Sequence, residues 1–290
     1  MKTCIQRRVF ALALLAQAHT TPGARPQKTA RGAAAAGGAV VFAVKKYESS
    51  VMMEPAFIYS RGAFVKPPEE PGVFIREYFR AGRKFRLLSG GGDSGTATVR
   101  KHIEPGCVGL LAEVEADTQA RLGGRVQALA TDSATVGRGA VARRAPSEAE
   151  RARAVKLARA AYAKNGVASR LASNMEVVNL TATDLDRDGR FELIGSFRVE
   201  RKEVPAPDAF TLFLIIEPEG ASFKTAWEWF HRGYEGEYAD RHFVDQVDLD
   251  GDGVGEVVAE GTYYESNDYV VYKRQQGRWR PVYQGGGGGC

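Results

Sequence analysis

Histidine, cysteine and long apolar runs are scarce in this chain of 290 residues, which holds 4 histidines and 3 cysteines. His231 and His242 have no cysteine or histidine partner at the spacing of a zinc site, so the sequence offers no zinc motif. The main apolar run, residues 9–18, is too short to span a bilayer, and we expect no membrane span. The chain also lacks a large excess of one charge. Its formal net charge of +5 falls to +2 without the three basic residues that precede that run. We therefore expect no nucleic-acid partner.

The first 18 residues have the layout of a signal peptide. Basic residues precede a short apolar segment, and Ala16-Gln17-Ala18 fits a small-x-small cleavage site. We expect cleavage after Ala18 and therefore a secreted or periplasmic protein. Residues 19–39 are rich in Ala, Gly, Thr, Pro and Arg without a periodic apolar pattern, which predicts a disordered leader.

Residues 40–116 predict a small N-terminal all-β unit. Its apolar or alternating segments are short, and Gly and Pro separate them. The predicted strands are 40–44, 57–59, 63–65, 73–79, 84–88, 96–100 and 108–114. A linker that contains one strand, 126–130, follows over residues 117–146.

The segment Gly92-Asp93-Ser94-Gly95 inside this unit has two interpretations. Its local pattern is also found around the nucleophile of trypsin-like serine proteases. His19 is the only histidine that precedes it, however, and that histidine is not in a suitable context for a catalytic base. We therefore favour a glycine-rich hairpin between two strands.

Residues 147–164 give the clearest helix signal and predict one connecting helix. Pro146 precedes the segment, Ser147 and Glu150 form a capping box, and Gly166 ends it. The apolar residues at helical spacing predict one packed stripe; they are Ala154, Val155, Ala158, Ala161 and Tyr162. We expect this helix, within residues 147–166, to cover a sheet.

Two acidic loops with the same spacing follow in the C-terminal part of the chain. The first runs from Asp184 to Glu192, and the second runs from Asp248 to Glu256, 64 residues later. Both read D-x-D-x-D-G-x-x-E. Side chains at positions 1, 3 and 5 of such a loop can converge on one point, and position 7 can add a carbonyl, which predicts an oxygen-only site for Ca²⁺. An EF-hand is excluded, because position 12 of neither loop is the required glutamate.

The loops resemble the calcium loops of FG-GAP and VCBS repeats, the units of integrin-type β-propellers. In that family positions 1, 3, 5 and 9 bind through side chains and position 7 binds through its carbonyl. The resemblance covers about residues 175–284 and implies two calcium sites. The implied ligands are Asp184, Asp186, Asp188, the Arg190 carbonyl and Glu192 in the first site, and Asp248, Asp250, Asp252, the Val254 carbonyl and Glu256 in the second. The chain departs from the family in closing each loop with Glu where Asp is usual, and two repeats do not make a complete propeller, which needs about four blades.

The C-terminal region repeats one layout twice, which predicts a duplicated β-unit. After each loop come a first strand (192–197; 256–262), a more apolar strand (211–216; 269–273) and an aromatic-bearing strand (220–227; 277–283). Two interpretations stay open for Trp227, Trp229, Phe230 and Trp279: core packing, which we favour, and a platform on which glycans stack.

Two cysteines, Cys107 and Cys290, remain after cleavage of the signal peptide. An oxidising compartment favours a disulfide between them, with residues 285–289 of the Gly-rich tail (285–290) acting as a flexible tether. A buried free Cys107 and an exposed thiol at the tail are the alternative.

These features predict a mainly β, exported calcium-binding protein. The family resemblance implies a non-catalytic module that binds an extracellular protein or a glycan. An extracellular hydrolase that carries a calcium-stabilised accessory module is the alternative, although no set of nucleophile, base and orienting residue is visible in the sequence.

Overall fold

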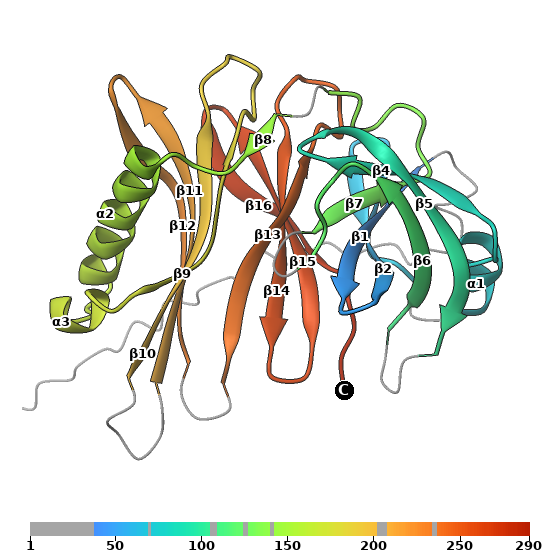
Figure 1. Ribbon diagram of the computed structural model, residues 1–290, viewed down its shortest axis with the longest axis horizontal. Coiled ribbons are helices and arrows are strands. Elements are labelled where there is room, and N and C mark those ends of the chain that lie inside the picture. The colour runs from blue at the N-terminus through green and yellow to red at the C-terminus, as the bar shows by residue number, and fades with distance from the viewer. Residues whose placement is uncertain are drawn as a thin grey trace, which may run out of the picture.

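The structure, a computed structural model, describes residues 38–68, 71–104, 109–123, 127–139, 142–201, 208–233 and 237–290. A closed barrel, a four-stranded sheet and a five-stranded sheet lie side by side in that order, and helices cover the outer face of the five-stranded sheet (Figure 1). The prediction of a mainly β fold is confirmed. In the described part of the chain, no helix combines the length and the apolar character that crossing a membrane requires.

The N-terminal strands build the barrel. They are β1 (Ala39–Tyr47), β2 (Ser50–Ser60), β3 (Ala63–Val65), β4 (Lys84–Ser89), β5 (Gly92–Ile103), β6 (Leu111–Thr118) and β7 (Ala128–Thr131). Their order is β1-β7-β4-β5-β6-β2-β3, and β1 pairs with both β7 and β2, so that six strands close into a ring. The strand predicted within residues 117–146 is therefore part of the barrel, where it lies between β1 and β4.

Strand β1 is buried on both faces over residues 40–44, which explains why its sequence is apolar there. Val40, Phe42 and Val44 belong to the core inside the barrel, whereas Val41 and Ala43 belong to a second core shared with the four-stranded sheet. All five side chains are 0% exposed. A strand that is buried on both faces reads as a continuous apolar run, which is the pattern seen here.

Residues 73–79 belong largely to a helix, α1 (Pro71–Tyr78), and the strand predicted there is wrong. Phe74 and Tyr78 are four residues apart and therefore lie on one helix face. Together with Phe79 they pack on Phe42 in the barrel core, at ring-centroid distances of 6.2, 6.1 and 6.1 Å. Burial of these three rings decides the conformation against the strand preference of aromatic residues.

The glycine-rich segment is a hairpin between β4 and β5, as predicted. Gly90 and Gly91 turn the chain with φ values of +65° and +78°. The Ser94 hydroxyl donates to the Leu87 carbonyl at 3.2 Å. Ser94 thus holds the hairpin together, and no described histidine contacts it.

Helix α2 (Glu148–Lys164) has the predicted bounds and the predicted capping box. The Ser147 amide donates to the Glu150 carboxylate at 2.7 Å, and the Glu150 amide donates to the Ser147 hydroxyl at 3.3 Å. The buried Tyr162 hydroxyl reaches the carbonyls of Phe197 and Phe210 at 2.9 and 3.1 Å, which fixes the helix on the sheet. A short helix that the sequence analysis missed, α3 (Ser169–Ala172), follows it.

The C-terminal strands form two sheets with the same layout. The first contains β8 (Arg143–Arg144), β9 (Glu176–Thr183), β10 (Glu192–Arg201), β11 (Asp208–Glu219) and β12 (Ser222–Gly233), and the second contains β13 (Ala239–Val247), β14 (Glu256–Tyr263), β15 (Asn267–Gln275) and β16 (Arg278–Gly285). Strands β9 to β12 and β13 to β16 are consecutive antiparallel neighbours, so the strand order predicted after each loop is confirmed. Among the described residues the two sheets do not continue into further blades, and no complete propeller is formed.

Each layer shares a core with the next. Helices α2 and α3 pack on one face of the five-stranded sheet. The other face, with Ile194 and Phe213, packs on Val257 and Tyr272 of the four-stranded sheet. The far face of that sheet, with Val258, packs on the outside of the barrel.

A buried polar cluster, which we call the seam cluster, lies where the barrel meets the four-stranded sheet. The Lys45 ammonium lies 2.5 Å from both the Glu54 and the Glu260 carboxylate, and the Gln127 amide donates to Glu260 at 2.7 Å. The Tyr269 hydroxyl donates to Glu54. The side chains of Lys45, Glu54 and Glu260 are 11%, 14% and 11% exposed, so the seam cluster is an ion triad largely removed from water.

The C-terminal glycines are docked and do not form the free tether that the sequence predicts. Gly288 exchanges two hydrogen bonds with Asn267, and the Cys290 amide donates to the Glu265 carbonyl at 2.9 Å. A Cβ at Gly286 would lie 2.2 Å from the Ala56 carbonyl oxygen, so only glycine fits there. Cys107, the other half of the predicted disulfide, lies outside the described residues.

Candidate metal centre

Each acidic loop joins the first two strands of its four-stranded repeat. In the first loop, Asp184 follows the end of β9 and Glu192 begins β10; in the second, Asp248 follows β13 and Glu256 begins β14. Positions 1 and 9 of each loop are therefore fixed by neighbouring strands of one sheet. The residues between them turn through left-handed conformations, with φ of +82° at Gly189 and +88° and +76° at Gly253 and Gly251.

Backbone hydrogen bonds shape the two loops in similar ways. The first aspartate accepts two amides of its own loop: Asp184 accepts those of Asp188 and Gly189 at 3.2 and 3.0 Å, and Asp248 accepts those of Gly251 and Gly253 at 2.7 and 3.2 Å. The glutamate accepts the amide at position 2, from Leu185 at 2.9 Å and from Leu249 at 2.8 Å. The shared sequence pattern thus specifies a shared loop conformation.

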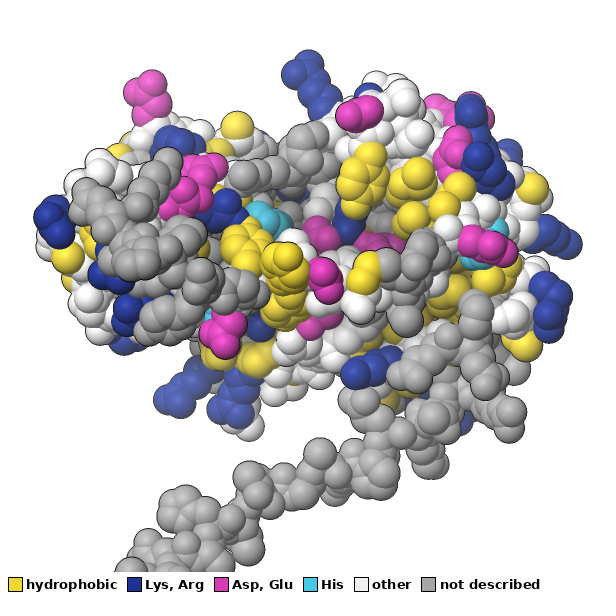
Figure 2. Space-filling view, turned by 90° about the horizontal axis from the view of Figure 1, so that it is seen from below, with side chains coloured by type: hydrophobic (Ala, Val, Ile, Leu, Met, Phe, Trp, Pro, Cys, Tyr) yellow, Lys and Arg dark blue, Asp and Glu magenta, His cyan; other side chains and the backbone are white. Residues whose placement is uncertain are grey.

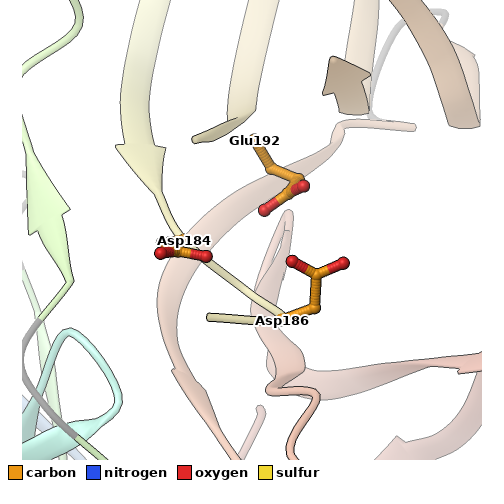
Figure 3. Close-up of side chains that lie close together, drawn as sticks. All are labelled: Asp184, Asp186 and Glu192. Carbon is orange, nitrogen blue, oxygen red and sulfur yellow. The ribbon is translucent and has the colours of Figure 1, made fainter. Parts of the chain in front are cut away.

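The loops gather carboxylates from positions 1, 3 and 9. Ligand atoms of Asp184, Asp186 and Glu192 all lie within 4.8 Å of one another, and the same holds for Asp248, Asp250 and Glu256. Figure 3 shows the first triad, with the three carboxyl groups turned toward a common space below the start of β10. Both triads could hold a metal ion through oxygen donors.

The predicted ligands at positions 5 and 7 are not part of these triads. Asp188 accepts the Arg190 amide at 2.7 Å, and Asp252 accepts the Val254 amide at 2.9 Å. Each of these aspartates therefore caps the turn that follows it. Coordination by the Arg190 and Val254 carbonyls stays a prediction.

Burial makes the closing glutamate of each loop a weak acid. Glu192 is 5% exposed and Glu256 is 2% exposed. Burial raises the pKa of Glu192 to about 8, and the neighbouring Asp186 and Asp188 charges contribute to the rise. Burial also raises the pKa of Glu256, to about 7, although Lys273 opposes that rise. A cation among the carboxylates would favour the ionised form of both groups.

The two loops touch each other. The Gly255 amide of the second loop donates to the Leu185 carbonyl of the first at 2.7 Å. Arg187 of the first loop pairs with Asp248 at 3.3 Å, and Arg274 of β15 pairs with Asp186 at 3.0 Å. These cross-connections place both loops at the same edge of the two packed sheets.

Lys273 of β15 lies among the carboxylates of the second loop. Its ammonium is 2.8 Å from Asp250, 3.0 Å from Asp252 and 2.6 Å from Glu256. The sequence analysis missed this residue, because its place beside Glu256 depends on strand pairing. Val257 of β14 is opposite Tyr272 of β15, and the strands are antiparallel, so Glu256 lies beside Lys273.

A cavity of about 910 Å³ opens beside the second loop. Tyr59, Phe64 and Tyr283 contribute aromatic side chains to its wall, and Asp250 and Lys273 contribute charged ones. The Phe64 and Tyr283 rings stack with centroids 5.4 Å apart. The cavity therefore combines an apolar wall with hydrogen-bonding groups, which is the usual composition of a ligand site.

The aromatic residues that could pack in the core or form a glycan platform all take part in core packing. Trp227 and Trp229 are half-buried and pack on the core between the two sheets. Trp279 is 3% exposed and donates to the Glu217 carboxylate at 2.9 Å. Phe230 packs on the core beneath α2. Core packing is thus the role that these contacts show.

Comparison with known proteins adds no relative to this description: no protein-family model matches the chain, and no curated protein or solved structure matches it.

Proposed function

We propose that this chain is an exported calcium-binding protein in which the metal stabilises a non-catalytic binding module of the FG-GAP/VCBS type. The observation that carries the proposal is the convergence of Asp184, Asp186 and Glu192, whose ligand atoms lie within 4.8 Å of one another. The shared conformation of the two loops supports it.

The donor set favours calcium. All the side chains in the triads are carboxylates, and hard oxygen donors suit Ca²⁺, which accepts six to eight ligands in flexible geometry. Mg²⁺ demands a near-ideal octahedron and retains several waters, so it fits a partly buried loop less well. Because the loop edge is open at Asp188, which is exposed, water can complete the coordination sphere.

The arrangement of strands supports the family resemblance. Propeller blades are four-stranded sheets, and each acidic loop here joins the first two strands of a four-stranded antiparallel repeat. A cation in the first loop would tie the end of β9 to the start of β10 and offset the mutual repulsion of their carboxylates.

The cavity beside the second loop supports the binding half of the proposal. Aromatic rings such as Tyr59 stack on sugars, and the exposed Gln275 and Gln284 in its lining can hydrogen-bond to hydroxyl groups. On the face seen from below in Figure 2, Lys and Arg side chains are scattered and do not gather into a basic patch. A glycan is therefore the partner that we propose for this cavity. Loss of a glycan-array signal in Tyr59→Ala, with folding intact, would identify the site, and an unchanged signal would exclude it.

Thermal unfolding with EDTA, Ca²⁺ or Mg²⁺ tests the metal. Calcium at one hundred times Kd stabilises the folded chain by about 2.7 kcal/mol per site. At about 2–4 °C per kcal/mol for a chain of this size, the midpoint should rise by about 5–10 °C. The double variant Asp184→Asn/Asp248→Asn should abolish the shift, whereas Asp117→Asn, which changes an exposed carboxylate on β6, should retain it. Identical midpoints in EDTA and in Ca²⁺ would refute calcium binding.

A further inference from the structure

We propose that Lys273 acts as a built-in counter-ion of the second acidic loop, so that the protein binds one divalent cation, at the first loop. This inference rests on the metal-binding function proposed above and restricts that function to one of two loops with the same sequence pattern.

Every carboxylate of the second loop already has a cationic partner. Lys273 lies 2.8, 3.0 and 2.6 Å from Asp250, Asp252 and Glu256. Asp248 is paired with Arg187 at 3.3 Å. The ammonium group therefore lies among the carboxylates that a metal ion would need.

The first loop is not neutralised in this way. Among the described residues, no ion pair reaches Asp184, Asp188 or Glu192, whose carboxylates accept backbone amides. Arg274 contacts one oxygen of Asp186, and the other oxygen of that carboxylate is buried with no hydrogen-bond partner in the described structure. The first loop thus retains oxygens that a cation could satisfy.

The difference comes from one pair of equivalent positions in the duplicated sheets. In the second sheet, the pairing of Val257 with Tyr272 places Lys273 beside Glu256. In the first sheet, the pairing of Leu193 with Ile216 places Glu217 beside Glu192. Glu217 accepts a hydrogen bond from the Trp279 indole at 2.9 Å and forms an ion pair with Arg274 at 3.4 Å. The position that carries a cation in one sheet therefore carries an acid in the other.

A metal ion entering the second loop would compete with a tethered cation. Lys273 is held on the neighbouring strand, so its effective concentration at the carboxylates is high and dilution does not reduce it. A displaced ammonium would also remain close to the metal ion and repel it. In the first loop the corresponding contact is smaller, because Arg274 reaches one oxygen of one carboxylate.

Counting bound calcium by equilibrium dialysis on the full chain tests the inference. The wild-type protein should bind one Ca²⁺, Lys273→Met should bind two, and Asp184→Asn should bind none. The double variant Lys273→Met/Asp184→Asn should again bind one. Lys224→Met removes a surface lysine whose side chain is 50% exposed and pairs with Glu219, and it should still bind one.

The outcomes separate this inference from the proposed function. Absence of binding in every protein would refute the metal-binding function itself. Two ions in the wild type, or one ion in a folded Lys273→Met, would overturn only the role of Lys273. Retention of one ion by Asp184→Asn would overturn the assignment to the first loop. If Lys273→Met does not fold, Lys273→Gln provides the same test with a polar, uncharged side chain.

Discussion

Replacing Lys45 by methionine is expected to destabilise the protein strongly, because it leaves the two carboxylates of the seam cluster, Glu54 and Glu260, without their cation. Glu54 and Glu260 each lie 2.5 Å from the Lys45 ammonium, and their side chains are only 14% and 11% exposed. Methionine retains most of the packing of the lysine stem, so the loss is chiefly electrostatic.

The expected magnitude follows from burial. Removing one partner of a buried ion pair costs roughly 3–5 kcal/mol, since the remaining charge is left uncompensated. At about 2–4 °C per kcal/mol, the unfolding midpoint should fall by about 6–20 °C. Lys46→Met, which changes an exposed neighbour on the same strand, should stay within about 0.5 kcal/mol of wild type.

The stability lost in Lys45→Met should also depend on pH. Burial alone would lower the pKa of Lys45, but Glu54 and Glu260 outweigh burial and raise it above its usual range. A raised lysine pKa contributes stability that is fully present below the ordinary lysine pKa and is lost as the pH rises through the folded value. The difference between wild type and variant should therefore persist up to about pH 10 and narrow at higher pH.

Urea unfolding at pH 7 and 9 measures this difference directly. The triple variant Lys45→Met/Glu54→Gln/Glu260→Gln removes all three charges and should regain much of the loss. A cost below about 1 kcal/mol for Lys45→Met at pH 7 would refute the argument, as would a triple variant less stable than the single one.

Two further predictions concern the first loop and the C-terminal glycines. Because burial raises the pKa of Glu192 to about 8, its ionisation costs the metal-free protein stability as the pH rises from about 4.5 to 8, and calcium must displace a proton at pH 7. Calcium affinity should therefore rise from pH 6 to pH 8.5, with proton release detectable by calorimetry in two buffers; a flat profile would contradict this. Gly286→Ala should destabilise more than Gly62→Ala, because both have positive φ (+72° and +77°) but only the former would place a Cβ against the Ala56 carbonyl. Equal midpoints for the two variants would show that the tail is not docked.

Local signals in the sequence specified some features well. The capping box of Ser147 and Glu150 predicts the bounds of α2 because both hydrogen bonds lie within one turn. The nine-residue pattern of the acidic loops predicts that their carboxylates converge, and positions 1, 3 and 9 do so, because the loops fold through their own amides; position 5, which was also predicted, lies outside the triads. The hairpin at Gly90 is likewise decided by backbone conformation within the segment.

Features that depend on pairing between distant strands could not be predicted. The barrel closes because β1 pairs with β7 and β2, and no local pattern encodes that closure. The segment around Phe74 was assigned to a strand because aromatic residues favour strands. Its helical conformation depends on the burial of these residues in the barrel core, which the local sequence does not show. Lys273 was missed because its role follows from the register of β15 on β14.

The contact between β16 and the barrel has a consequence for the time course of biosynthesis. The Tyr283 hydroxyl donates to the Ala56 carbonyl across 227 positions of sequence. At about 5–20 residues per second, roughly 10–45 s separate the synthesis of the two partners. Throughout that interval Phe57, on the outer face of the nascent barrel, lacks the Tyr283 ring that packs against it. The barrel strands are therefore made well before the strand that shields this face.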